Sequence, residues 1–294
     1  MNLALGLDLG GTNIKLVCVA ASGKLIAQQS IATEDDARGV WAEHVKNLVA
    51  AIEQEHGKVK WLGLAAPGLA ARDHRAIAFM PGRMQGLEQL DWTSYLQREH
   101  TVTVLNDAHA ALLGEHWRGA AKNFAHAILL TLGTGVGGAI LSHGKLLTGA
   151  IGRAGHLGHI CLDLHGAKDI VHTPGSIEGL IGDCTIHARS NGRFTSTEEL
   201  VAAHLAGDAR ATEIWLASIY ALACAIASCV NLLDPEAVII GGGISKAGAA
   251  LFAPLENFLH EVEWRPGGHR VKILPAQLED WAGAFGAARF AMLN

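Results

Sequence analysis

Two glycine-rich segments, far apart in the chain, constrain its fold more than any other feature. Residues 7–13 are Leu-Asp-Leu-Gly-Gly-Thr-Asn, and residues 131–138 are Thr-Leu-Gly-Thr-Gly-Val-Gly-Gly. Each follows an apolar run typical of a β-strand, so each is predicted to form a tight turn. Glycine permits positive φ angles there, and its missing side chain lets a bulky anion approach the backbone N–H groups. Two such loops facing each other would hold a polyphosphate, which favours an enzyme that uses ATP.

The composition indicates a folded protein with a large core. The chain has 294 residues, of which 50% are hydrophobic and 17% charged, and this length accommodates two domains of ordinary size. The net charge is −5, with no run of Lys and Arg, so neither nucleic acid nor a membrane is expected as a partner. Five cysteines without paired spacing, and no signal peptide at the start, predict a cytoplasmic protein with free thiols.

One stretch, residues 214–233, is apolar and long enough to resemble a membrane span. It contains Ser218, Ser228 and Asn231, and it lacks basic flanking residues. We therefore interpret it as a buried core helix.

The order of predicted elements occurs twice along the chain. The first series has strands over residues 3–9, 14–20 and 24–32, a helix over 36–56, strands over 59–65 and 102–105, and a helix over 106–117. The second series has strands over residues 125–132, 137–142 and 145–148, helices over 178–190, 197–206 and 209–233, a strand over 237–240, a helix over 251–262, a strand over 271–275 and a closing helix over 281–293. Because each series begins with three strands and continues with helices and further strands, the sequence predicts two α/β domains, residues 1–115 and 116–294, with the closing segment 281–294 expected to pack on the first.

Five motifs in a characteristic order resemble those of one family. They are residues 8–12, Asn106-Asp107, residues 132–138, Gly155-His156-Leu157-Gly158-His159, and residues 239–243. Together they resemble the ROK family (repressor, open reading frame, kinase) of actin-like sugar kinases, over nearly the whole chain. The resemblance implies an α/β protein with an actin-like ATPase (ribonuclease H-like) fold, in which two α/β domains have a cleft between them. It also implies a sugar kinase that is often a homodimer.

Some ROK members are transcription repressors with an added N-terminal helix-turn-helix. Here the first phosphate loop begins at Asp8, which leaves no room for such a domain in this sequence. A kinase is therefore expected rather than a repressor.

Asp107 is the candidate catalytic base. It is predicted to lie where a strand ends and a helix begins, and a helix N-terminus favours the ionised carboxylate. A carboxylate at this place can take a proton from a sugar hydroxyl as it attacks the γ-phosphate, and the resemblance implies the same role. The alternative is that Asn106 or Asp107 only caps the helix.

The resemblance and the glycine pattern together predict the nucleotide site. A carboxylate beside phosphates favours Mg²⁺ bound by Asp8, directly or through water, although an Asx turn would also explain Asp8. Lys15 either reaches a phosphate or is solvated. The phosphate-binding residues are expected to be Gly10, Gly11 and Thr12 on the first loop and Gly133, Thr134 and Gly135 on the second. By resemblance, Gly241, Gly242 and Gly243 lie against the adenosine, and the alternative for them is a strand-to-helix turn alone.

The sugar site follows from the resemblance. It implies contacts from Gly68, Asn106, Asp107, His156, His159 and Glu178. Polar side chains of defined geometry suit a ring of hydroxyls, because a missing hydroxyl leaves buried polar groups unpaired and so gives selectivity.

Three departures from the family pattern bear on the substrate and the metal content. His156 stands where the family usually has Glu, as in some members that resemble N-acetylmannosamine kinases. The family's three zinc-binding cysteines are replaced by Asp169, Val171 and Ser176, so no structural zinc is expected.

The loop that contains these three positions has few other residues that could bind zinc in place of the thiolates. Nearby Cys161, His165 and His172 do not have the spacing of a metal site, and Pro174 with apolar packing by Ile177 and Leu180 is expected to hold the loop instead.

The third departure is an asparagine that the family supplies to the sugar. Here the comparable stretch is residues 80–86, and two interpretations stay open: either Arg83 or Gln85 replaces the asparagine, or the arginine is a surface residue.

The sequence therefore predicts transfer of the ATP γ-phosphate to a hydroxyl, expected to be the 6-hydroxyl, of a hexose or N-acetylhexosamine. The identity of the sugar stays open, and the departures put glucose in doubt. One alternative is a non-catalytic sugar-binding regulator of the same fold, against which the retained Asp107 argues. Another is a polyphosphate-dependent sugar kinase, and the glycines at 241–243 favour ATP over it.

Overall fold

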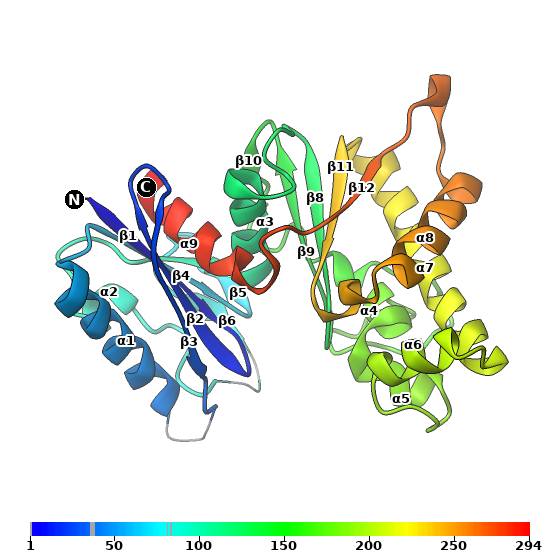
Figure 1. Cartoon of the computed structure of the whole chain (residues 1–294), viewed down its shortest axis with the longest axis horizontal. Helices are drawn as coiled ribbons and strands as arrows, with labels where there is room; N and C mark the ends of the chain where they lie inside the picture. Colours follow the sequence, from blue (N-terminus) through cyan, green and yellow to red (C-terminus); the bar gives the residue numbers. More distant parts are fainter. Residues whose placement is uncertain (1, 36–38, 81, 83) are drawn as a thin grey trace. The chain divides into compact units, whose positions relative to one another are not determined.

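The computed structural model describes residues 2–35, 39–80, 82 and 84–294. The chain forms two compact units. The first comprises Met1–Asn123, Leu146–Ala154 and Gln277–Asn294, and the second comprises Phe124–Lys145 and Gly155–Ala276. Each unit is built on a five-stranded mixed sheet with helices packed against it (Figure 1).

The two sheets have the same strand order. The first contains β1 (Leu3–Leu9), β2 (Asn13–Ala20), β3 (Leu25–Ala32), β4 (Trp61–Ala66) and β7 (Thr103–Asn106), in the order β3-β2-β1-β4-β7. The second contains β8 (Ala127–Leu132), β9 (Val136–Ser142), β10 (Lys145–Leu146), β11 (Ala237–Gly241) and β12 (Lys272–Pro275), in the order β10-β9-β8-β11-β12. In both, the central strand pairs antiparallel with the next strand of its hairpin and parallel with the strand on its other side. The repeat predicted from the sequence is confirmed.

Strand β1 shows how alternating side chains build the first unit. Leu3, Leu5, Leu7 and Leu9 point into one core cluster, which also contains the buried face of α1 (Val40–His56). The intervening Ala4 packs instead against α9 (Ala282–Leu293) on the opposite face. Because side chains alternate across a strand, large residues face one helix and small residues face the other.

The small face allows α9 to approach the sheet and α3 (Asp107–Arg118) very closely. A Cβ added at Gly6 or Gly63 would overlap backbone atoms of α9, and one at Gly286 of α9 would overlap the backbone of α3 at Ala110. The sequence of α9 is accordingly rich in Ala and Gly. This helix comes from the end of the chain, and residues Gln277–Asn294 belong to the first unit.

A buried carboxylate holds the segment that precedes α9. The side chain of Glu115 on α3 is inaccessible to solvent. Its Oε1 accepts hydrogen bonds from Leu278 N (2.7 Å) and Gln277 N (3.0 Å), and its Oε2 accepts one from Ala120 N (2.7 Å). These bonds compensate the burial of the charge.

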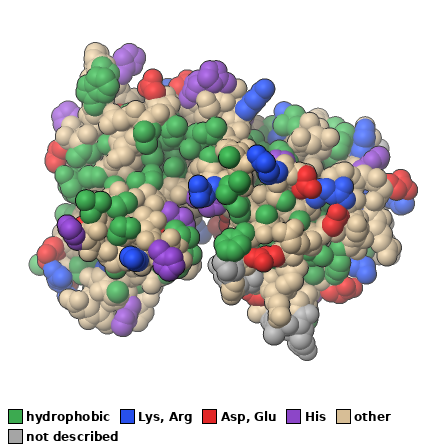
Figure 2. Space-filling view, turned by 180° about the vertical axis from the view of Figure 1, so that it is seen from behind, with side chains coloured by type: hydrophobic (Ala, Val, Ile, Leu, Met, Phe, Trp, Pro, Cys, Tyr) green, Lys and Arg blue, Asp and Glu red, His purple; other side chains and the backbone are tan. Residues whose placement is uncertain are grey.

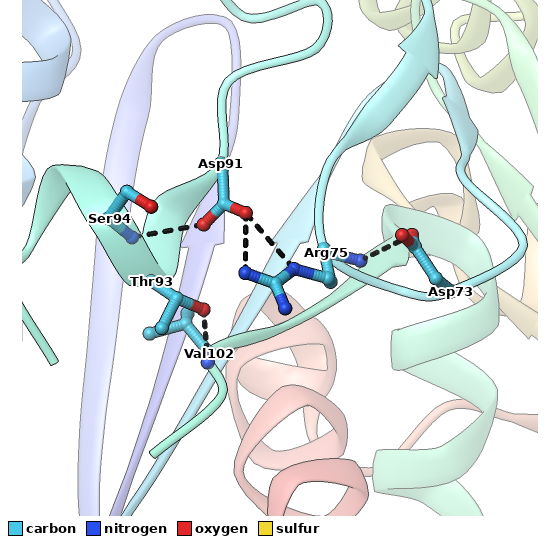
Figure 3. Close-up of polar contacts among 6 residues, drawn as sticks. All are labelled: Asp73, Arg75, Asp91, Thr93, Ser94 and Val102. Carbon is cyan, nitrogen blue, oxygen red and sulfur yellow. Dashed lines mark hydrogen bonds and ion pairs between the residues drawn. The ribbon is translucent and has the colours of Figure 1, made fainter. Parts of the chain in front are cut away.

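Polar contacts also order the segment between β4 and β7, which contains β5 (Leu69–Ala70), β6 (Ile77–Phe79) and α2 (Trp92–Tyr95). Arg75 donates to Asp91 Oδ2 from Nη2 (2.6 Å) and Nε (3.0 Å), as Figure 3 shows. Asp91 Oδ1 caps α2 by accepting from Ser94 N (2.9 Å). The Ser94 N–H and then Arg75 stabilise the charged form and hold the pKa of Asp91 below its ordinary value.

The helices of the second unit share one core. They are α4 (Ile177–Ile181), α5 (Ile186–Arg189), α6 (Thr197–Leu205), α7 (Ala209–Leu233) and α8 (Ala249–Val262). The described chain also contains short 3₁₀ helices, which are η1 (Leu157–His159), η2 (Asp183–Thr185), η3 (Gly243–Ala247), η4 (Pro266–Gly268) and η5 (Glu279–Trp281). Within the described part of the chain, α7 alone is long and apolar enough to cross a membrane. Its residues Trp215, Leu222 and Ile226 are buried in the core of this unit, which supports its interpretation as a core helix.

The prediction of one helix over residues 178–190 is wrong. The chain is extended at Gly182 (φ −58°, ψ 144°), which separates α4 from η2 and α5. The Thr185 hydroxyl makes 3.0 Å hydrogen bonds with the carbonyls of Gly179 and Gly182. Such local side-chain bonds compete with continuous helix.

Figure 2 shows charged side chains of both signs among the described residues on one face of the molecule. Lys and Arg side chains lie there singly or in small groups among acidic side chains and histidines. The five cysteines are free thiols, as predicted.

Candidate active site

The Asn106-Asp107 pair lies where β7 ends and α3 begins. Asn106 Oδ1 caps α3 by accepting from Ala108 N (3.0 Å) and His109 N (3.2 Å), while its Nδ2 donates to Gly68 O (3.0 Å). Asp107 is the first residue of the helix and is exposed, with one oxygen accepting from Ala108 N (2.8 Å). Capping therefore rests mainly on Asn106, and the Asp107 carboxylate faces solvent.

Gly68 requires glycine for two reasons. Its φ is +98°, in the region that L side chains rarely adopt. A Cβ there would also crowd Phe79 O and the side chain of Met80. The turn at Gly68 thus brings its carbonyl to Asn106.

Asp8 sits near the end of β1, paired with Lys15 on β2 and with Ala65 on β4. A Cβ at Gly283, in the first turn of α9, would overlap the Asp8 carboxylate. Burial is the main factor that raises the pKa of Asp8 to about 7, and the negative charge of Asp107 raises it further. Lys15 opposes this shift. A half-buried carboxylate near a second carboxylate is a site where a cation relieves repulsion.

These carboxylates do not form a closed metal cage. Among the described residues, no group of three or more His, Cys, Asp or Glu side chains could hold a metal ion. Mg²⁺ does not require such a cage, because it is commonly held by one or two carboxylates, waters and substrate phosphates. Asp8 therefore fits Mg²⁺ that arrives with a nucleotide.

The first glycine loop is held by a threonine that sequence reasoning missed. Gly10 N donates to Asn13 O (3.0 Å), closing the turn between β1 and β2. The buried Thr33 donates from its hydroxyl to Gly10 O (2.6 Å) and from its N–H to Thr12 O (2.9 Å). Nothing in the local sequence marks Thr33, because its partners lie on another hairpin.

The second glycine loop is braced by α4 and η2. Gly133 N donates to Gly135 O (3.0 Å), and the carbonyls of Gly133 and Thr134 accept from Asp183 N and Cys184 N (both 2.9 Å). Glu178 Oε2 accepts from Val136 N (3.0 Å), immediately after the loop. These hydrogen bonds define the backbone shape of the loop.

A cavity of about 600 Å³ in the second unit brings several predicted nucleotide residues together. It is lined by Gly133, Thr134, Asp183, Ser196, Thr197, Glu198, Val201, Leu205, Gly243, Ile244, Lys246 and Ala247. The lining combines apolar side chains, polar side chains, and the glycines Gly133 and Gly243. Within the described part of the chain, the buried Thr197 Oγ1 has no hydrogen-bond partner.

Of the three glycines at 241–243, only Gly243 lines this cavity. Gly241 ends β11, and Gly242 (φ +86°) lies so close to the backbone of Leu132 that a Cβ would overlap it. The first two glycines thus shape the turn that carries Gly243.

The remaining predicted sugar residues lie in the second unit. His156 precedes η1, and His159 ends it. Glu178 is in the first turn of α4, whose N-terminus is capped by Ser176 Oγ accepting from Gly179 N (3.3 Å). His159 Nδ1 lies 2.8 Å from Asp169 Oδ2.

Of the two residues predicted to replace the family's asparagine, the structure describes only Gln85. Arg83 lies outside the described residues, and Gln85 is exposed.

Comparisons with known proteins agree with this architecture. The sequence model of the ROK family matches residues 4–293. The chain is 30% identical to the glucokinase of Thermotoga maritima, covering 97% of this chain and 95% of the relative. It is 31% identical to the N-acetylmannosamine kinase of Yersinia pestis, covering 99% of each. Among solved structures, a ROK glucokinase from Streptomyces griseus in complex with glucose and AMPPNP superimposes with a TM-score of 0.82 at 27% identity, covering 100% of both chains.

Proposed function

Since this chain belongs to the ROK family and is a sugar kinase with the actin-like ATPase fold, we propose that it transfers the γ-phosphate of ATP to a hydroxyl of a hexose or N-acetylhexosamine. The expected acceptor is the 6-hydroxyl. In this proposal the first unit carries the first phosphate loop and the base, and the second carries the second phosphate loop and the adenosine site.

The position of Asp107 carries the proposal. Because Asn106 supplies the main cap of α3, the adjacent carboxylate is exposed at a helix N-terminus, where its charged form is stabilised. An ionised carboxylate can accept the proton of a sugar hydroxyl as that oxygen attacks phosphorus. Asp107 is thus the proposed catalytic base.

Asp8 is the proposed protein ligand of Mg²⁺, directly or through water. When bound, Mg²⁺ would neutralise charge on the phosphates. The chain's own contribution is a carboxylate whose ionisation is opposed by burial and by Asp107, so an arriving cation is favoured. Gly10, Gly11 and Thr12 on one loop and Gly133, Thr134 and Gly135 on the other are proposed to bind the phosphates.

The cavity beside Gly133 and Gly243 supports a nucleotide as the donor. Val201, Leu205 and Ile244 give it apolar lining suited to a purine, and Ser196 offers a hydroxyl. Polyphosphate has no base to fill such a cavity. We therefore propose ATP, with Gly243 against the adenosine.

The proposed sugar contacts come from Gly68, Asn106, His156, His159 and Glu178, together with Asp107. His156 can donate or accept a hydrogen bond without carrying charge. Because one relative at 31% identity is named an N-acetylmannosamine kinase, N-acetylmannosamine is the first sugar to test, beside glucose. We also propose a cytoplasmic homodimer, which light scattering on the purified protein would check.

A coupled assay of ADP release, run over hexoses, ketoses and N-acetylated amino sugars, tests the activity. We expect turnover with at least one sugar, and ³¹P–¹H correlation spectra of the product should place phosphorus on C6. Saturating binding of a sugar without turnover of any would favour a regulator. Turnover with polyphosphate but not with ATP would replace the proposed donor.

A further inference from the structure

Asp169 is a buried carboxylate at the centre of the loop between η1 and α4. Its side chain is only 3% exposed. Oδ2 lies 2.8 Å from His159 Nδ1, and Oδ1 accepts from Val171 N (3.0 Å) and Thr173 N (2.9 Å). The Ser176 side chain also forms a hydrogen bond with this carboxylate.

These bonds join two ends of the loop that carry proposed sugar residues. His159 ends η1, and Ser176 caps the helix whose first turn contains Glu178. Backbone bonds close the loop around the carboxylate, from Asp169 N to Thr173 O (3.0 Å) and from Ile177 N to Ile160 O (3.0 Å). Asp169 is therefore the polar centre of a loop for which the sequence predicts only proline and apolar packing.

The residues of this loop do not fit a tetrahedral zinc site. The three positions expected to supply thiolates hold Asp169, Val171 and Ser176, and a valine offers no ligand. The Nδ1 atom of His159 is already engaged by the carboxylate. In this chain, hydrogen bonds to one carboxylate supply the cross-links that a metal ion would supply.

The carboxylate also determines which tautomer a neutral His159 ring adopts. An ionised carboxylate only accepts hydrogen bonds, so Nδ1 must carry a proton, and Nε2 of the neutral ring is then an acceptor. Burial alone would raise the pKa of Asp169, but the bonds from His159 and the backbone N–H groups bring it below its ordinary value. The His159 side chain is 24% exposed although Asp169 is buried, so part of the ring remains accessible.

We propose that Asp169 is a positioning residue that orders this loop without a metal and holds His159 as the Nδ1–H tautomer, with Nε2 available to a sugar hydroxyl. The last part rests on the proposed function of His159. The ordering of the loop and the tautomer of His159 do not depend on it.

Asp169→Asn separates these two roles. The Asn oxygen can keep the bonds from Val171 N and Thr173 N, while its NH₂ group faces His159 and requires Nδ1 to accept. The loop should therefore remain folded while the tautomer inverts. Asp163→Asn, on the same loop, is the matched control, because Asp163 Oδ1 accepts from His165 N (2.9 Å) and Asn can do the same.

Long-range ¹H–¹⁵N spectra of the imidazoles give a readout that does not require activity. We expect His159 in the wild type and in Asp163→Asn to show a protonated Nδ1 and an unprotonated Nε2, and Asp169→Asn to show the reverse. Exhaustive chelation should leave the wild-type spectrum and melting temperature unchanged. An Nε2–H tautomer in the wild type, or stoichiometric zinc whose removal unfolds the loop, would overturn the proposal.

Kinetics then test the link to the sugar. Asp169→Asn should raise the sugar KM about tenfold through the lost hydrogen bond, with the ATP KM unchanged. An unchanged sugar KM with an inverted tautomer would remove His159 from the sugar site and overturn the positioning role in catalysis. If the wild type phosphorylates no sugar although the spectra are as expected, the proposed function fails while the metal-free ordering stands.

Discussion

At the scale of residues, the adjacent side chains of Asn106 and Asp107 differ in their contacts. Asn106 makes three hydrogen bonds, two to the start of α3 and one to Gly68. Its neighbour Asp107 keeps an exposed carboxylate at the same helix end. Asp8 and Glu115 show the two ways a carboxylate is tolerated away from water. Glu115 is satisfied by backbone N–H groups, whereas Asp8 has a raised pKa.

Asp107→Asn should lower kcat by about 10²–10⁴-fold, because the amide cannot accept the hydroxyl proton. The KM for ATP should change little. Steady-state kinetics with the best sugar measure this, and Asp73→Asn is the control, since Asp73 is exposed and its Oδ1 accepts a hydrogen bond from Arg75 N (3.1 Å), which an Asn oxygen can also accept. Wild-type turnover in Asp107→Asn would remove this residue from its proposed role.

Asp8 should make the metal-free protein less stable as pH rises. Its pKa is about 7 in the folded protein against an ordinary value of 3.8, so the folded state holds the proton more tightly. The contribution of the Asp8 proton to the free energy of unfolding is fully present below pH 3.8. It decreases as pH rises to about 7, by roughly 1.4 kcal/mol per pH unit at most.

Asp8→Asn should therefore melt at a higher temperature than the wild type at about pH 8 without metal, and at a similar temperature near pH 4. Mg²⁺ with nucleotide should narrow the difference at high pH by stabilising the wild type. Thermal melts across this pH range measure both effects. A variant that is equally or less stable than the wild type at high pH would contradict the shift.

At the scale of elements, α9 shows how residue size controls packing. The helix lies against β1, β4 and α3 through glycines on both sides of the contact, including Gly6, Gly63 and Gly286. Close approach of backbones replaces the usual interlocking of large side chains.

Gly286→Ala should destabilise the first unit by about 1–3 kcal/mol, because the added methyl overlaps the α3 backbone at Ala110. Helix propensity alone would predict a gain of up to about 1 kcal/mol. Gly179→Ala in α4 is the matched control, since its Cβ would meet only Ser176 Oγ at 3.6 Å. Urea unfolding measures the free energy of unfolding of each variant, and hydrogen exchange in α9 shows whether this helix is loosened. Together they distinguish destabilisation by overlap from stabilisation by helix propensity. A stabilised Gly286→Ala would show that α9 can move away without cost.

At the scale of the whole molecule, each unit has its own sheet and its own core. The core of the second unit includes α7 and α8, and that of the first includes α1. The cavity proposed for adenosine is lined entirely by the second unit. Binding of a nucleoside to the whole protein should therefore slow amide exchange within the second unit.

ADP without metal should slow amide exchange in α6, in η3 and around Gly133, because these segments line the cavity. Hydrogen-exchange mass spectrometry measures the protection. Inorganic polyphosphate is the control, and it should leave α6 unprotected since it has no base. Equal protection of α6 by both ligands would contradict an adenosine site there.

Much of the architecture could be predicted because its determinants are local. Alternating Leu and small residues mark β1, and the helix of residues 209–233 was predicted with the bounds that α7 has. The break at Gly182 was missed because it depends on hydrogen bonds of Thr185 that no periodicity reveals. Thr33 and Asp169 were missed for a related reason, since their partners are distant or lie in an irregular loop.

The repeated order of elements, the two glycine loops and the family could be inferred from residue patterns alone, because strand periodicity, turn glycines and ordered motifs are properties of neighbouring residues. Three outcomes required the folded chain: Asn106 supplies the main cap, Gly243 rather than Gly241 or Gly242 lines the cavity, and Asp169 engages His159. Those outcomes depend on which donors and acceptors meet when separate segments pack, and residue types alone do not specify such meetings.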